Sequence, residues 1–291
     1  MSRLASRLRV VAALAVAGLV TLLNPAAHAR GQSQRPVFRA GADGVELFVS
    51  VRAGDRPVDG LTADDFEVLD NGVPQLVQSA STGGVPLDAV VAVDTSGSTA
   101  DSLGDFKRRV QAMLDLLGPR DRIALITFSN FVHEVFSLRP AALVDEATLS
   151  SVRTEGATTA RNAVVASIIL SPEEPGRRRL VVIFTDGHDT ASTMQSTSML
   201  DVVRRSDVTV HVGGAAADAD IDDVVDVSGG RVHRTGAMVR VFQEILDEAR
   251  GSYILRYVPS GVAIEGWHDL AVRVRTSERY EVRARRGYFG G

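Results

Sequence analysis

The 291-residue chain contains no cysteine, which removes several kinds of chemistry at once. Disulfide frameworks, zinc–thiolate sites, thiol catalysis and lipid attachment at a cysteine are all excluded. Lysine is nearly missing as well: Lys107 stands alone among the 32 basic residues, and the rest are arginine. We interpret this imbalance as genome composition bias without functional meaning.

Long hydrophobic runs are limited to one, the 14 residues of Val10–Leu23, which are apolar apart from Thr21. A basic start precedes this run, and the small residues Ala27-His28-Ala29 follow it. The pattern predicts a secretory signal peptide over residues 1–29. The alternative is an uncleaved anchor, although crossing a bilayer takes about 20 apolar residues. We therefore expect an exported protein, periplasmic or extracellular, with no membrane span in its mature chain.

An excess of positive charge is also missing. The formal net charge is −4, and it becomes −7 once Arg3, Arg7 and Arg9 leave with the signal peptide. An acidic protein is a poor candidate for non-specific nucleic-acid binding, so we expect no nucleic-acid partner. The sequence also lacks a G-x-S-x-G elbow, an H-E-x-x-H metalloprotease motif and a G-x-x-x-x-G-K phosphate loop. We therefore predict that the protein is not an enzyme.

The residue pattern divides the remaining chain into four parts. We expect a disordered linker over residues 30–44, a β extension over 45–84, an α/β domain over 85–250 and a second β extension over 251–291. In the α/β domain, buried apolar strands alternate with amphipathic helices, one of them predicted over 141–152. This alternation predicts a doubly wound, mostly parallel, Rossmann-like sheet with helices on both faces. We expect the tail strands to pair with each other and with the edge of this sheet, and to pack against the first β extension.

Oxygen-bearing side chains gather where strands of the predicted sheet end. Asp94-Thr95-Ser96-Gly97-Ser98 ends the apolar run 87–93, and Thr185-Asp186-Gly187 ends the run 180–184. Gly156-Ala157-Thr158 precedes the helix predicted near Ala160. Ligands of open α/β sheets bind beyond the carboxyl ends of the strands. Mg²⁺, Mn²⁺ and Ca²⁺ share a preference for such oxygen ligands, so the three loops predict a divalent-cation site. The alternative is that the first motif only caps the helix that begins near Leu103.

These motifs resemble those of the von Willebrand factor type A domain, whose metal-ion-dependent adhesion site uses D-x-S-x-S, a later Thr and an Asp that ends a strand. All five ligand positions match, and in this sequence they are Asp94, Ser96, Ser98, Thr158 and Asp186. The segments Pro57–Val68, Tyr253–Tyr257 and Arg285–Phe289 are similar to the flanks of bacterial secreted proteins of this kind. The resemblance implies that Asp94 and Asp186 act largely through bound water. It also implies a Mg²⁺ or Mn²⁺ site that captures a carboxylate of a partner protein.

Several other residues are candidates for a functional role. Asp189 is a candidate for orienting a metal ligand from outside the direct ligand set. His188 or Asp186 is the base in the alternative reading, a Mg²⁺-dependent hydrolase that uses metal-activated water. The acidic residues Asp218, Asp220, Asp222 and Asp223 suggest either calcium or a helix start, and we favour the helix start.

Two sets of arginines are interpreted as solvated faces, with an anionic surface or acidic partner as the alternative. The first set is the basic segment 176–179. The second is formed by Arg273, Arg275, Arg283 and Arg285. The oligomeric state is left open by the sequence.

Overall fold

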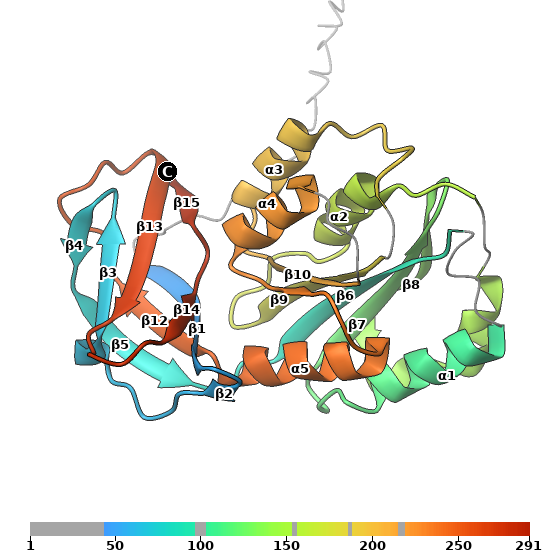
Figure 1. Ribbon diagram of the computed structural model, residues 1–291, viewed down its shortest axis with the longest axis horizontal. Helices are drawn as coiled ribbons and strands as arrows, with labels where there is room; N and C mark the ends of the chain where they lie inside the picture. The colour runs from blue at the N-terminus through green and yellow to red at the C-terminus, as the bar shows by residue number, and fades with distance from the viewer. Residues whose placement is uncertain (1–43, 97–102, 153–155, 186–187, 215–218) are drawn as a thin grey trace, which may run out of the picture. The chain divides into compact units, whose positions relative to one another are not determined.

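The computed structural model describes residues 44–96, 103–152, 156–185, 188–214 and 219–291. Its largest element is a six-stranded sheet in the order β11-β10-β9-β6-β7-β8 (Figure 1). All neighbouring strands are parallel except β7 and β8, which form a hairpin. The strands are β6 (Leu87–Asp94), β7 (Arg122–Phe128), β8 (Val132–Pro140), β9 (Arg178–Phe184), β10 (Thr209–Gly213) and β11 (Val232–His233). Every residue of β6 and β9 is buried, as expected for central parallel strands covered on both faces.

Helices cover both faces of this sheet. They are α1 (Leu103–Leu114), α2 (Ala160–Ile169), α3 (Ser196–Arg204), α4 (Ala219–Ser228) and α5 (Met238–Gly251). One hydrophobic core lies between the sheet and α1 and α5, and a second lies between the sheet and α2, α3 and α4 (Figure 1). The predicted doubly wound α/β fold is confirmed. Among the described residues, no helix is both long and apolar enough to cross a membrane.

The helix predicted over residues 141–152 is wrong. Two 3₁₀ segments occupy the region, η2 (Ala141–Leu143) and η3 (Glu146–Ser151). Asp145 separates them, because its side chain accepts hydrogen bonds from the backbone nitrogen of Thr148 at 2.8 Å and from the Thr148 hydroxyl at 2.7 Å. This local side-chain bond starts a new turn and competes with a continuous helix.

The two β extensions form two further sheets that share a third hydrophobic core. One sheet has the order β14-β1-β12-β5, with β2 paired to β1, and the other has the order β15-β13-β3-β4. The strands are β1 (Val45–Ala53), β2 (Arg56–Pro57), β3 (Phe66–Asp70), β4 (Val73–Gln75), β5 (Val77–Thr82), β12 (Tyr253–Tyr257), β13 (Gly266–Val274), β14 (Glu281–Arg283) and β15 (Gly287–Gly290). Both sheets combine strands from the two ends of the sequence, and in the first sheet these strands alternate. The expected pairing with the edge of the six-stranded sheet does not occur among the described strands. The limits of the domains stay a prediction.

A buried polar network joins strands of both terminal sheets. Asp70 on β3 accepts hydrogen bonds from the hydroxyls of Tyr257 at 3.0 Å and Tyr288 at 2.9 Å. His268 Nδ1 lies 2.7 Å from the other carboxylate oxygen of Asp70. Asp70 also ends β3 before the turn to β4, in which Asn71 has φ 47° and Gly72 has φ 79°. Two successive left-handed residues are typical of the tight hairpin turn that Asn-Gly predicts.

Candidate metal centre

Asp94 ends β6 with its carboxylate almost completely buried, at 3% exposure. One oxygen, Oδ1, accepts a hydrogen bond from the backbone nitrogen of Ser96 at 2.9 Å. The other oxygen, Oδ2, accepts a hydrogen bond from the Thr185 hydroxyl at 2.7 Å. Both oxygens therefore have fixed directions, and Ser96, also buried, lies directly beside them.

Thr185 reaches Asp94 because the sheet places their two strands side by side. Val93 of β6 is in register with Phe184 of β9, so the next residue of each strand stands at the same edge. The Thr185 backbone nitrogen is held as well, since it donates to the carbonyl of Gly213 at 3.1 Å. Sequence reasoning missed this threonine. Its one signal is its place between a buried strand and a predicted ligand, Asp186.

Thr158, the third predicted ligand that the structure describes, is buried just before α2. Its backbone nitrogen donates to the Thr190 hydroxyl at 3.0 Å, and its carbonyl accepts from the backbone nitrogens of Thr190 at 2.9 Å and Ala191 at 3.1 Å. These bonds fasten the Thr158 segment to the segment that follows β9. The preceding residue, Ala157, donates its backbone nitrogen to the Asn130 side chain at 3.0 Å, which adds the β7–β8 loop.

Two of the five predicted ligands, Ser98 and Asp186, lie outside the described residues, so they stay predictions. The described part of the site brings Asp94 and Ser96 together at the end of β6. It also ties Thr185, the residue before Asp186, to Asp94. Thr158 is bonded to the segment after β9.

Asp189 is bound to the start of α2. It accepts hydrogen bonds from the Arg161 backbone nitrogen at 2.8 Å, the Ser192 backbone nitrogen at 3.0 Å and the Ser192 hydroxyl at 2.6 Å. It also forms an ion pair with the Arg161 guanidinium at 3.2 Å. Burial raises the pKa of Asp189, but these hydrogen bonds and the nearby Arg161 charge outweigh it and hold the pKa below its ordinary value. Asp189 therefore anchors the helix that follows Thr158, and a role in orienting a ligand stays a prediction. His188, beside it, is exposed.

The donor set fits a hard divalent cation. The described donors are a buried carboxylate and two buried hydroxyl residues, all oxygen ligands. Within the described ranges, no group of three His, Cys, Asp or Glu side chains is placed to hold a metal ion. That finding is compatible with this site, because two of its described donors, Ser96 and Thr158, are alcohols. The chemistry favours Mg²⁺, Mn²⁺ or Ca²⁺ over the softer ions that thiolate ligands select.

The acidic cluster near residue 220 is engaged in other contacts. Asp220 accepts a hydrogen bond from Ser196 and pairs with Arg161 at 3.4 Å. Asp222 pairs with Arg234 at 3.1 Å, and both acids stand in the first turn of α4. The helix-start interpretation is therefore confirmed for these two residues, while Asp218 lies outside the described residues.

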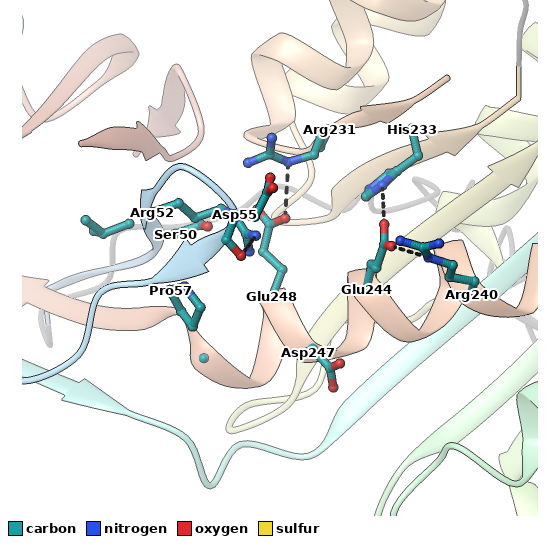
Figure 2. A pocket seen from close by; sticks show the side chains of 12 residues that line it. Ser50, Arg52, Asp55, Pro57, Arg231, His233, Arg240, Glu244, Asp247 and Glu248 are labelled. Atoms are coloured by element: carbon teal, nitrogen blue, oxygen red, sulfur yellow. Dashed lines mark hydrogen bonds and ion pairs between the residues drawn. The ribbon is translucent and has the colours of Figure 1, made fainter. Parts of the chain in front are cut away.

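A second polar region, which the sequence did not reveal, is a cavity of about 610 Å³ lined by residues of β1, β2 and α5 and by Arg231 and His233. Figure 2 shows Glu248 directed to Arg231, at 3.3 Å, and Glu244 directed to His233, at 3.5 Å. Burial raises the pKa of Glu248, but His211, Arg231 and Ser50 lower it by more. Burial lowers the pKa of His233, and it lowers the pKa of the neighbouring His211 to about 3. The lining charges largely pair with one another, so we assign this cavity no ligand.

Comparison with known proteins places these observations in a family. A family model described as the von Willebrand factor type A domain matches residues 88–247. A comparison with curated proteins gave no match. Among solved structures, the chain is similar to a von Willebrand factor type A protein from Catenulispora acidiphila. The identity is 12% and the TM-score 0.49, over 85% of this chain and 73% of that one.

Two further solved structures are similar over a shorter part of the chain. One is an aerotolerance-related membrane protein from Bacteroides fragilis NCTC 9343, with 16% identity and a TM-score of 0.45, over 56% of this chain and 98% of that one. The other is proximal thread matrix protein 1 from the mussel byssus, whose MIDAS motif is occupied by zinc. It has 12% identity and a TM-score of 0.48, over 62% of this chain and 50% of that one.

Proposed function

The chain belongs to the von Willebrand factor type A domain family, and from this premise we propose that it is an exported protein-binding module. In this proposal, Asp94, Ser96, Ser98, Thr158 and Asp186 hold a divalent cation, Mg²⁺ or Mn²⁺. The bound cation captures an acidic group of a partner protein. Domains of this family are generally interaction modules, and many carry a metal-ion-dependent adhesion site.

The observation that carries the proposal is the fixed, buried carboxylate of Asp94. A buried carboxylate costs free energy unless its oxygens are satisfied, and here Ser96 and Thr185 each donate to one oxygen. Both of these donors are neutral groups, a backbone nitrogen and a hydroxyl. A carboxylate buried at a sheet edge next to alcohol oxygens is suited to receive a metal cation.

The neutral and the charged residues of the site have different roles in holding a cation. Ser96, Ser98 and Thr158 are neutral donors, so they cancel none of the metal charge. When bound, the divalent cation supplies a positive charge and a coordination position for an incoming oxygen. Asp94 and Asp186 balance the charge formally, and Thr185 holds Asp94 in one orientation. The arrangement favours a carboxylate from a partner protein as the last ligand.

Export is the part of the proposal that rests on sequence. The signal-peptide pattern of residues 1–29 supports it, as does the complete lack of cysteine, which is compatible with an oxidising compartment. The alternative, a hydrolase, would use Asp186 or His188 as its base. Because the sequence lacks the catalytic motifs considered above, we expect no phosphoester hydrolysis from the purified protein with Mg²⁺ or Mn²⁺.

Metal binding and metal-dependent capture test the proposal together. Titration calorimetry with Mn²⁺ should give one site in the wild type, and Asp94→Ala should weaken it by about a hundredfold or more. The matched control is Asp115→Ala, which removes an exposed carboxylate at the end of α1. Partners captured from envelope extract with Mg²⁺ should be released by a chelator. Capture that survives both the chelator and Asp94→Ala would refute the proposal.

A further inference from the structure

Phe131 is a large apolar side chain left open to solvent, at 67% exposure. Six large hydrophobic residues are exposed in the described part of the chain, and Phe131 is the aromatic one among them. Isolated exposed hydrophobics are normal on protein surfaces, so exposure alone proves nothing. The position of Phe131 in the fold is what gives it a role.

Phe131 lies in the loop that follows β7, at the edge of the sheet where Asp94 ends β6. Phe128, the last residue of β7, is in register with Asp94, and its carbonyl accepts a hydrogen bond from the Thr95 backbone nitrogen at 2.9 Å. Phe128 is also paired with Val132 of β8, so residues 129–131 form a three-residue hairpin loop. This loop therefore begins beside the carboxylate of the metal centre and ends at Phe131.

The loop is held rigidly against a second part of the same site. The Ser129 backbone nitrogen donates to the carbonyl of Phe131 at 3.1 Å. The Asn130 side chain accepts a hydrogen bond from the Ala157 backbone nitrogen at 3.0 Å, directly before Thr158. The hairpin that carries Phe131 is thus bonded both to the residue after Asp94 and to the residue before Thr158. An aromatic side chain on a fixed backbone loses little conformational entropy when a partner covers it.

We propose that Phe131 is a specificity-determining contact beside the candidate metal centre. It selects partner proteins in which an apolar side chain lies next to the carboxylate that binds the metal. This inference rests on the proposed function of the site. Charge complementarity between the cation and a carboxylate gives no information about neighbouring residues in the partner. Fully buried aromatic residues, in contrast, often dominate interface energies. The occupant that fits both features is a polypeptide with Asp or Glu next to Leu, Ile, Met or Phe.

A phage-displayed peptide library with a fixed central Asp tests this partner chemistry. The library is selected on the full chain with Mn²⁺, and clones are eluted with a chelator so that metal-dependent binders alone are recovered. For the wild type, apolar residues within two positions of the Asp should be enriched several-fold. Phe131→Ser should abolish this enrichment but keep the requirement for Asp, which a library with Asn in place of Asp measures. Mn²⁺ affinity and the circular dichroism spectrum should not change.

Ile169→Ser is the matched control. Ile169 is 69% exposed, and it ends α2, about 14 Å along the helix from its start beside Thr158. This variant should keep the apolar enrichment of the wild type. Asp-dependent clones with no apolar preference, or a preference that survives Phe131→Ser, would overturn the role of Phe131 and leave the proposed function standing. A selection without any Asp-dependent, chelator-eluted clones would overturn both.

Discussion

The buried histidine of β10 should make the protein sensitive to mild acid. His211 is 2% exposed, and its Nδ1 is buried without a hydrogen-bond partner. Burial is the main cause that lowers its pKa from 6.5 to about 3; Glu248 opposes the shift, while His233, Arg178 and Arg231 add to it. Figure 2 shows part of this surrounding group, with Arg231, His233 and Glu248 around one cavity. The native ring therefore stays neutral at pH 5, whereas the ring of the unfolded chain does not.

The size of the effect follows from proton linkage. As pH falls below 6.5, the unfolded chain binds a proton at His211 and the native protein does not, so the free energy of unfolding falls. Each pH unit between 6.5 and 3 removes up to about 1.4 kcal/mol. The loss begins near pH 6.5, the pKa of His211 in the unfolded chain. Between pH 7 and pH 5 the free energy of unfolding therefore falls by about 2 kcal/mol. Well above pH 6.5 His211 is neutral in both the native and the unfolded state, so its protonation no longer reduces the free energy of unfolding.

Urea unfolding at pH 7 and pH 5 measures this loss, and His211→Asn isolates it. Asn removes the titrating ring, so the stability difference between the two pH values should shrink by about 2 kcal/mol relative to the wild type. Any constant destabilisation by the substitution cancels, because each protein is compared with itself. His133→Asn on the exposed side of β8 is the control and should leave the difference unchanged. An equal pH difference in His211→Asn and wild type would show that His211 is not a buried neutral group.

Two further predictions concern Asp94 and Asp70, buried carboxylates that accept hydrogen bonds from hydroxyl groups. Thr185→Val removes the hydroxyl bonded to Asp94, so Mn²⁺ affinity should fall by about ten- to a hundredfold, while Thr185→Ser should restore it; equal calorimetric affinity in all three proteins would contradict the positioning role. Asp70→Ala leaves the hydroxyls of Tyr257 and Tyr288 without their buried acceptor, so the free energy of urea unfolding should fall by about 3 kcal/mol. A loss below about 1 kcal/mol would show that the network contributes little.

The grouping of candidate ligands at the end of β6 was predictable because the sequence keeps those residues together. Asp94 and Ser96 are two residues apart at the end of an apolar run, and Thr158 carries a short motif of its own. Thr185 was not predictable, because its role depends on β6 and β9 being neighbours in the sheet.

The limits of strand β15 could not be predicted from the sequence, for a different physical reason. It begins at Gly287 and ends at Gly290, and glycine weakens the propensity of a strand. Glycine is nevertheless required at the first position of β15, because a Cβ on Gly287 would lie 2.3 Å from the Trp267 ring. The contacts that define the strand are therefore long-range ones with β13, such as the ring contact between Trp267 and Phe289 at 5.2 Å.

The interpretation of the arginines as solvated faces is wrong for the residues that join the parts of the fold. In the segment 176–179, Arg178 is buried, donates to the carbonyl of Ala249 at 2.7 Å and stacks on the Phe48 ring. Arg179 is also buried, and it pairs with Asp207. Arginines that alternate with other residues along a strand indicate that the strand has two different faces. The alternation does not indicate which face contacts another part of the fold. Pairing partners far away in the sequence decide that.

The same holds in the tail, where Arg273 and Arg275 are exposed but Arg283 and Arg285 are bound. Arg283 donates to the carbonyl of Gly230 at 2.8 Å, and Arg285 donates to the carbonyl of Ser206 at 2.9 Å, just beyond the end of α3. Carbonyls near a helix end lack partners within the helix, and a guanidinium offers several donors in a fixed fork. A lysine could satisfy fewer of them at once. The contacts between the terminal sheets and the α/β domain thus depend on the several donors of the guanidinium group, in a chain that contains almost no lysine.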